Sequence, residues 1–283
     1  METRSILKQL TLSEKVSLCT GGSLWRTAAV PRLNLPPILM IDGPHGINKS
    51  EINDDEKYEF NGSIQATSYP SACCTCCSFN REIMFKMGAS LGQEMIYDGV
   101  SIILGPGMNI KRSPLCGRNF EYFSEDPILA SEIASSYIKG IQSKGVGACI
   151  KHFAANNQET RRFFVSATID ERTFHEIYLA AFEGAIKEGK PWAIMSSYNM
   201  INGVQSSVNS ELLTHVLREE WKWSLEKEEQ PEVPFSGGMV VSDWFGTYDR
   251  IDGFKAGLDL SMPNEESLVE QIVEAVQSGK LEE

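Results

Sequence analysis

The sequence is short of basic residues, of long apolar runs and of any apolar leader. It has 26 Lys and Arg against 38 Asp and Glu, a net charge of −12. Nucleic acids and anionic membranes are bound through basic surfaces, so neither is an expected partner. The longest uncharged stretches, 61–80 and 191–210, are too polar for a bilayer interior, so no membrane span is expected. The N-terminal segment lacks the apolar region of a signal peptide, which predicts a cytoplasmic location.

Cysteine is present in an odd number, seven, in a chain long enough to fold without disulfides. We therefore expect reduced thiols. The run Cys73-Cys74-Thr75-Cys76-Cys77 contains two overlapping C-x-x-C spacings, but the other three cysteines are isolated. In a strand the four side chains would point alternately to opposite faces and would not converge on one ion. We predict buried small side chains here, with no metal and no cofactor.

Short apolar runs alternate with segments of helical periodicity along most of the chain. Strands that are nearly all apolar indicate a parallel sheet covered on both faces. Seven or eight such strands occur, and no dinucleotide fingerprint follows the first. A (β/α)8 barrel uses about 250 residues, so we predict a closed TIM-type barrel as the one domain, over 1–283. The expected strands are 37–41, 69–79, 100–104, 147–153, 192–197, 238–242 and 258–262, and the expected helices are 5–19, 81–97, 128–143, 171–187, 210–221, 250–257 and 266–278. An acidic segment, 224–234, is expected to be a solvated excursion.

Active-site residues of such barrels follow the carboxyl ends of the strands. Those positions hold carboxylates, bases and aromatics, but no His and Asp cluster at metal spacing. Asp243 stands out because the apolar run GGMVVS delivers a single carboxylate to the rim. A buried Asp needs cations or donors, and Lys151, Arg162 and Arg118 could supply a pairing that keeps it ionised. The alternative is that Asp243 caps the following helix.

Four segments follow one another in a fixed order: GPGMNIKRSPLCGRNFEYFSEDP, KHFAANNQETRR, SSYNMINGV and VVSDW. Together they resemble the N-terminal barrel of the glycoside hydrolase family 3 β-glucosidases, and the resemblance covers nearly the whole chain. It implies a β-glucoside or oligosaccharide substrate and hydrolysis of terminal non-reducing β-D-glucosyl residues. It also implies retention of configuration through a covalent glycosyl-enzyme on Asp243. The implied donor-sugar site consists of Asp42, Arg118, Lys151, His152, Arg162, Tyr198 and Trp244.

The second carboxyl group of a retaining glycosidase is not found in these motifs. Retaining enzymes hold two carboxyl groups about 5 to 5.5 Å apart. In the β-glucosidases that the chain resembles, the acid/base glutamate lies in a C-terminal α/β-sandwich domain, which we expect to be absent here. Another branch uses a histidine after a KHFPGHG-like motif, whereas this sequence has KHFAANNQ. We therefore expect impaired catalysis by the isolated barrel. The chain would then be a fragment, or one half of a split enzyme that works with a complementary chain.

Two other interpretations stay open. The first is a catalytically silent barrel that binds glycans or a partner protein. The second is a β-xylosidase or an exo-glycosidase of mixed specificity. Three acidic residues could equally bind the ligand or form ion pairs that fix loops, and we leave them outside the site. They are Glu121, Asp126 and Glu159. The histidines interpreted as structural or surface residues are His45, His175 and His215.

Overall fold

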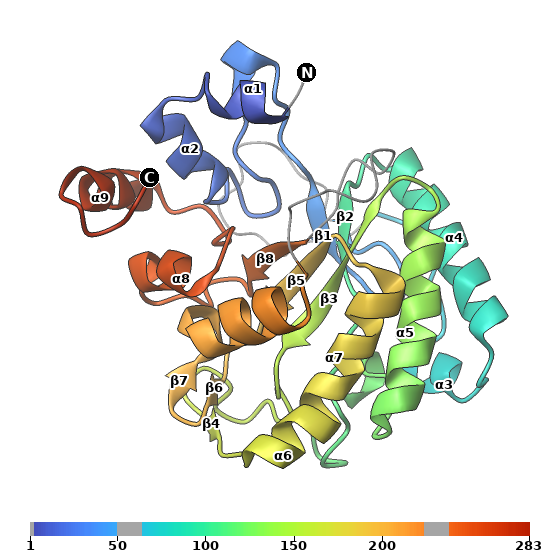
Figure 1. Ribbon diagram of the computed structural model, residues 1–283. Coiled ribbons are helices and arrows are strands. Elements are labelled where there is room, and N and C mark those ends of the chain that lie inside the picture. The colour runs from blue at the N-terminus through green and yellow to red at the C-terminus, as the bar shows by residue number, and fades with distance from the viewer. Residues whose placement is uncertain (1–2, 50–63, 224–237) are drawn as a thin grey trace.

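The structure is a computed structural model that describes residues 3–49, 64–223 and 238–283. Five parallel strands form one sheet in the order β1-β2-β3-β5-β8. Figure 1 shows this sheet in the middle of the molecule, with α4, α5 and α7 along its outer side. Each strand lies inside a segment predicted to be one, or extends it by a single residue. The strands are β1 Met40–Asp42, β2 Ile102–Leu104, β3 Gly147–Phe153, β5 Ala193–Ser196 and β8 Met239–Ser242.

Single β-bridges connect the two edges of this sheet through the N-terminal segment. One bridge adds the segment after α8 to β8, a second joins that segment to the residues after α2, and a third returns to the residue before β1. A fourth bridge, Gly21 to Thr27, lies between the second and the third. The five-stranded sheet is thus a curled half-barrel whose edges are linked, among the described residues, only by single bridges, and the α/β architecture agrees with the predicted TIM-type domain. The first three bridges are Val241 to Leu260, Thr20 to Ser261 and Arg26 to Leu39.

Helices lie between the strands and largely match the predicted segments. The segment 81–97 was predicted at the bounds that α4 has, and the helix predicted over 171–187 is a continuous helical stretch over 171–189, from α6 to η4. The predicted helix 5–19 is wrong in extent, because Thr11 and Glu14 form a capping box that starts a second helix. The helical segments are α1 Thr3–Leu7, α2 Leu12–Leu18, η1 Pro31–Leu33, α3 Ala72–Cys76, α4 Arg81–Tyr97, η2 Asn119–Glu121, α5 Pro127–Gln142, α6 Glu171–Thr173, η3 Phe174–Leu179, α7 Ala180–Gly184, η4 Ala185–Gly189, η5 Ser206–Val208, η6 Glu211–Glu220, α8 Arg250–Ala256 and α9 Glu266–Gln277.

The predicted strand 69–79 is wrong: the cysteine run forms the short helix α3. Ala72, Thr75 and Cys76 are buried, whereas Cys74 and Cys77 are exposed. Burial at positions i, i+3 and i+4 is the pattern of a helix with one face on the core. Four cysteines of equal hydrophobicity conceal that pattern in the sequence. All seven cysteines are free thiols, and within the described part of the chain no group of His, Cys, Asp or Glu could hold a metal ion.

The parallel sheet has five regular strands among the described residues, fewer than the seven or eight predicted for a closed barrel. The segment 258–262 makes bridges but forms no ladder with β8. A second sheet was not predicted, and its strands are β4 Ser166–Ala167, β6 Met200–Ile201 and β7 Val204–Gln205. These two-residue strands are too short to give a periodic signal. The acidic segment 224–234 lies outside the described residues.

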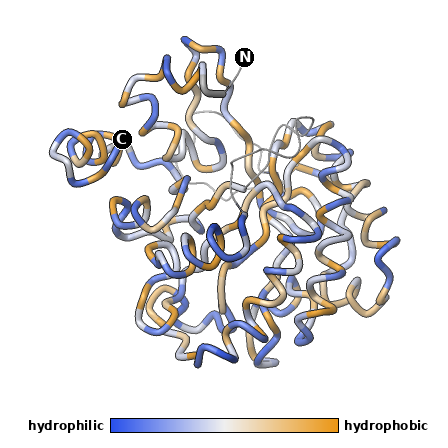
Figure 2. Tube along the Cα trace, viewed as in Figure 1, coloured by the Kyte–Doolittle hydropathy of each residue, from blue (hydrophilic) through white to orange (hydrophobic). Residues whose placement is uncertain are grey.

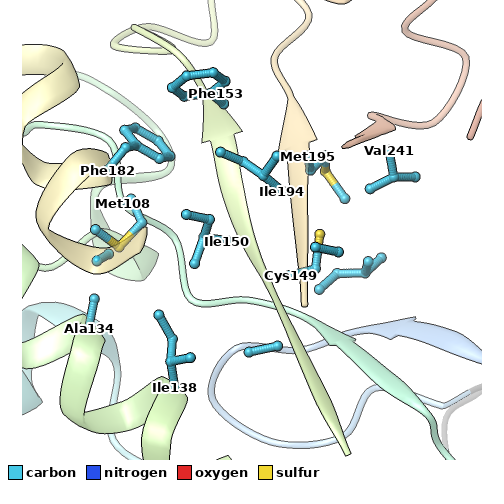
Figure 3. Packing of buried hydrophobic residues seen from close by; sticks show 14 of the residues in the cluster. Met108, Ala134, Ile138, Cys149, Ile150, Phe153, Phe182, Ile194, Met195 and Val241 are labelled. Atoms are coloured by element: carbon cyan, nitrogen blue, oxygen red, sulfur yellow. The ribbon is translucent and has the colours of Figure 1, made fainter. Parts of the chain in front are cut away.

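The core fills both sides of β3. Ile150 lies toward α5, near Ala134 and Ile138, whereas Cys149 lies toward Met195 on β5 (Figure 3). This alternation is the pleat of a strand that is buried on both faces. Figure 2 shows mainly hydrophobic residues along the sheet and frequent polar residues on the surrounding helices. None of the helices in the described ranges is both long and apolar enough to cross a membrane. The packed strands therefore provide a rigid base for the side chains at their carboxyl ends.

Candidate active site

Polar side chains meet at the carboxyl ends of the parallel strands. Asp42 is the last residue of β1, and Asp243 directly follows β8. Lys151 and His152 lie in the second half of β3, and both are buried. Because parallel strands end at the same rim, residues far apart in the sequence come together here. Each of the eight predicted site residues contacts either another predicted site residue or a neighbouring carboxylate, as described below.

A buried cluster of alternating charge surrounds Lys151. Its Nζ lies 3.1 Å from Asp42 Oδ1 and 3.7 Å from Glu121 Oε2. The Arg118 Nε donates to the other carboxylate oxygen of Glu121. Burial by itself would lower the pKa of Lys151, but the Asp42 and Glu121 carboxylates outweigh it and raise that pKa. Lys151 is therefore a fixed cation, with donors directed toward the rim.

His152 lies between this cluster and Asp243. Its Nε2 is 3.7 Å from Asp243 Oδ2, and its Nδ1 is 3.0 Å from the Tyr122 hydroxyl. The Asn109 side chain holds the backbone of His152, accepting from its N–H at 2.8 Å and donating to its carbonyl at 2.9 Å. Burial, followed by the positive charges of Arg118 and Lys151, lowers the pKa of His152 well below its ordinary value. The ring is therefore neutral at physiological pH.

Asp243 has a buried carboxylate with one satisfied oxygen. Oδ1 accepts from the Trp244 backbone N–H at 2.8 Å, whereas Oδ2 receives no hydrogen bond of good geometry from the described residues. The side chain keeps 11% of its surface exposed. Burial raises its pKa to about 6, although the nearby Arg118 and Lys151 charges act to lower it. An unpaired, poorly solvated carboxylate oxygen at a strand end is a reactive group.

Two expectations about Asp243 are corrected by these contacts. Direct pairing with Lys151, Arg118 or Arg162 is not among the ion pairs of the described residues, because each cation is held by another carboxylate. The cations act on Asp243 through their field instead. The alternative role as a helix cap is also wrong: α8 is capped by Asp249, whose side chain accepts from the Asp252 N–H.

Tyr198 and Arg162 pack against each other near Asp243. The Tyr198 hydroxyl donates to the Trp244 carbonyl at 2.7 Å, and it lies close enough to Asp243 to lower the pKa of that carboxyl. The Arg162 guanidinium lies over the Tyr198 ring, 4.6 Å from its centroid, and its Nη1 is 2.8 Å from Glu159 Oε2. The ring is therefore fixed at its hydroxyl and on its face.

Trp244 is buried beside the nucleophile candidate. Its indole N–H donates to the Leu24 carbonyl at 2.6 Å, and its ring lies 5.2 Å from that of Trp25. The N-terminal segment thus fixes the residue next to Asp243. Trp244 was predicted at the edge of the sugar site; it directly follows Asp243 in the chain, and only 8% of its surface is exposed.

The acidic residues left outside the site hold loops in place. Glu121 and Glu159 pair with site cations, and Asp126 accepts from the backbone N–H groups of Ile128 and Leu129 at the start of α5. Sequence reasoning missed Tyr122 and Asn156, which contact His152 directly and indirectly. Both lie within the quoted motifs, but neither is at a strand end. The only feature of the sequence that could have identified them is that they lie within these motifs.

Lys151→Met should strongly destabilise the fold. The Lys151 side chain is 3% exposed and that of Glu121 is 5% exposed, so the substitution leaves buried negative charge with less compensation. Breaking a buried ion pair costs about 3 to 5 kcal/mol. Chemical denaturation followed by circular dichroism measures the free energy of unfolding. The control Lys86→Met removes an exposed pair with Glu82 and should cost less than about 0.5 kcal/mol. Equal effects of the two substitutions would contradict this account.

The chain is similar in sequence to known glycoside hydrolases. Residues 53–283 match the model of the glycosyl hydrolase family 3 N-terminal domain. The chain is 52% identical to thermostable β-glucosidase B of Acetivibrio thermocellus, with 100% of this chain and 36% of that protein covered. It is 46% identical to an exo-α-(1→6)-L-arabinopyranosidase of Bifidobacterium longum, with 96% and 34% covered. The chain therefore spans about a third of the length of these curated relatives.

A solved structure gives the same result. β-Glucosidase 3B of Thermotoga neapolitana in complex with glucose superposes with a TM-score of 0.87 at 42% identity, over 98% of this chain and 40% of that chain. The match covers the strands and the loops that carry the candidate site. The chain thus belongs to glycoside hydrolase family 3, of which it spans the N-terminal barrel domain.

Proposed function

We propose that the barrel carries the donor-sugar site and the nucleophile of a retaining β-glucosidase that removes terminal non-reducing β-D-glucosyl residues. The observation that supports it best is Asp243, a buried carboxylate directly after β8 whose Oδ2 has no hydrogen-bond partner among the described residues and lies beside neutral His152. In a retaining mechanism this carboxylate attacks the anomeric carbon and forms a covalent glycosyl-enzyme. The oxocarbenium-like transition state gains from its negative charge.

The surrounding residues suit a sugar. A pyranose presents several hydroxyl groups and one apolar face, so it needs acceptors, donors and an aromatic surface. Asp42 supplies an exposed acceptor, with 44% of its side chain accessible, and Lys151 and Arg118 supply donors. Tyr198, held by Arg162, and Trp244 supply ring surface beside Asp243. The similarity to a barrel solved with glucose supports the same assignment.

We infer that the acid/base carboxyl comes from outside the described residues. The carboxylates of the charged cluster are each engaged by a cation: Asp42 by Lys151, Glu121 by Arg118 and Glu159 by Arg162. A general acid must instead be free to deliver its proton to the leaving group. A C-terminal α/β-sandwich domain, on the same or a complementary chain, is the proposed source.

The first chemical step should depend on pH through Asp243. Burial raises the pKa of its carboxyl to about 6, and only the ionised form is nucleophilic. Release of phenolate from an activated aryl glucoside should therefore be constant above about pH 7 and fall roughly tenfold for each pH unit below about 5. Stopped-flow absorbance measures this rate. A rate that stays constant down to pH 4 would contradict the raised pKa.

Phenolate release from dinitrophenyl β-D-glucoside, β-D-xyloside and α-L-arabinopyranoside tests the proposed function. The pentopyranosides are included because a relative 46% identical is named an arabinopyranosidase, and because they lack the 6-hydroxymethyl group. We expect the glucoside to give the fastest release, in an initial burst equal to the chain concentration. A faster pentoside would assign the site to pentopyranosides, and no release from any of the three would support a silent, glycan-binding barrel.

A further inference from the structure

A chain of polar contacts runs from a loop to the candidate nucleophile. The Asn156 Nδ2 lies 3.1 Å from the Tyr122 hydroxyl, which lies 3.0 Å from His152 Nδ1. The other ring nitrogen, Nε2, lies 3.7 Å from Asp243 Oδ2. Tyr122, His152 and Asn156 are all buried. The proposed function uses His152 and Asp243 but assigns nothing to Tyr122.

The direction of each proton follows from the partners. Asn156 Nδ2 also lies 3.2 Å from Glu159 Oε1, and a carboxylate accepts hydrogen bonds, so the nitrogen end of this amide faces Glu159 and Tyr122. The Tyr122 oxygen therefore accepts from Asn156. Its single proton is then directed to His152 Nδ1, which must accept. A neutral imidazole that accepts at Nδ1 carries its proton at Nε2.

We propose that Tyr122 is a positioning residue that fixes His152 in the Nε2–H tautomer, so that the ring presents a donor to Asp243 and to a sugar hydroxyl beside it. The other tautomer would direct a nitrogen lone pair at the Asp243 carboxylate, and two acceptors repel. At 3.7 Å the two atoms are too far apart for a direct hydrogen bond. One hydroxyl between them can accept from Nε2–H and donate to Oδ2. This use of the tautomer rests on the proposed function.

His152 stays neutral in these surroundings, so the property that can vary is which ring nitrogen carries the proton. The ring is edge-on to Tyr122, with centroids 6.0 Å apart, and Asn109 bonds both the backbone N–H and the backbone carbonyl of His152. Burial lowers the pKa of His152, and the charges of Arg118, Lys151 and Arg162 lower it further, so a second proton is disfavoured. The ring therefore has one proton and two places for it, and Tyr122 is the contact that distinguishes them.

Imidazole ¹⁵N chemical shifts of the chain test this proposal without any need for activity. His152→Gln identifies the His152 signals among those of the four histidines. In the unsubstituted chain we expect a pyridine-type shift at Nδ1 and a pyrrole-type shift at Nε2. The reverse assignment, or a doubly protonated ring at pH 7, would overturn the proposal. This readout holds even if Tyr122→Phe fails to fold.

Tyr122→Phe removes only the hydroxyl and should move both His152 shifts toward averaged values. In the same variant the first-step kcat/KM for the activated glucoside should fall about fivefold, the factor that one neutral hydrogen bond supplies, with Tyr122→His as a donor-retaining variant that restores part of it. The control Tyr137→Phe also loses a buried hydroxyl contact, to the Pro44 carbonyl, and should leave the His152 shifts unchanged. Unchanged shifts in Tyr122→Phe would overturn the proposal, whereas correct shifts without glucosidase activity would count against the proposed function alone.

Discussion

Asp243→Asn is expected to abolish the first chemical step and to stabilise the fold. The amide keeps the hydrogen bond that the Trp244 N–H makes to Oδ1 at 2.8 Å, so the local geometry is retained. An amide oxygen is a poor nucleophile, and loss of a nucleophile costs on the order of 10⁴- to 10⁶-fold in rate. Phenolate release from the activated glucoside measures this loss. Retained release would show that another residue attacks the sugar.

The stability gain follows from the raised pKa of Asp243. Its carboxyl changes from an ordinary value of 3.8 to about 6 on folding, so between these values the folded state holds a proton that the unfolded state has lost. Stability therefore falls as pH rises through this window, and at pH 7 the ionised carboxylate costs on the order of 2 to 3 kcal/mol. Asp243→Asn should recover this amount at pH 7 and nothing below about pH 3.5.

Denaturant unfolding at both pH values measures that difference. The control Asp252→Asn changes an exposed carboxyl on α8 and should alter the free energy of unfolding by less than about 0.5 kcal/mol at either pH. A loss of stability in Asp243→Asn at pH 7 would contradict the burial cost assigned to this carboxylate.

Hydrolysis by this chain should depend steeply on the leaving group. The described carboxylates of the cluster are engaged by cations, so none of these three is free to supply a proton when an alkoxide leaves. A dinitrophenolate leaves without one. The relevant quantity is kcat/KM for the dinitrophenyl glucoside divided by kcat/KM for an alkyl β-glucoside. We expect this ratio to be about 10² to 10⁴ times larger for this chain than for an enzyme with general acid catalysis.

A series of aryl glucosides with graded leaving groups provides the internal control. The plot of log(kcat/KM) against leaving-group pKa should be linear and steep, because every leaving group in the series must depart as an unprotonated anion. A flat plot would mean that a residue of this chain acts as the acid, and the proposal of an outside carboxyl would then be wrong.

The sequence predicted the fold well where the local signal and the burial coincide. β3 is buried at all seven positions, and its apolar run gave the observed bounds. α4 begins with the Asn80 cap and ends before Gly99, both visible in the sequence. The cysteine run failed because its residues have equal hydrophobicity and only tertiary contact decides which of them is buried. The bridges beside the two edges of the sheet are single residue pairs, which no periodicity in the sequence encodes.

The sequence pointed to a set of candidate site residues, which stays a prediction, but it did not reveal the network of contacts among them. Strand ends and motifs located Asp42, Lys151, His152 and Asp243. They did not show that each cation is held by its own carboxylate, because such pairing depends on the conformation of segments between the strands, such as the short helix η2. Tyr122 acts on a ring nitrogen 30 positions away in the sequence, and only the folded arrangement brings the two together.

Covalent labelling tests the central claim most directly. The chain would be incubated with a dinitrophenyl 2-deoxy-2-fluoro-β-D-glucoside, whose glycosyl-enzyme is slow to hydrolyse, then digested and analysed by peptide mass spectrometry. The account predicts one fluoroglucosyl adduct per chain, on Asp243, and none in Asp243→Asn. An adduct on a different residue, or an unlabelled chain at saturating reagent, would contradict it.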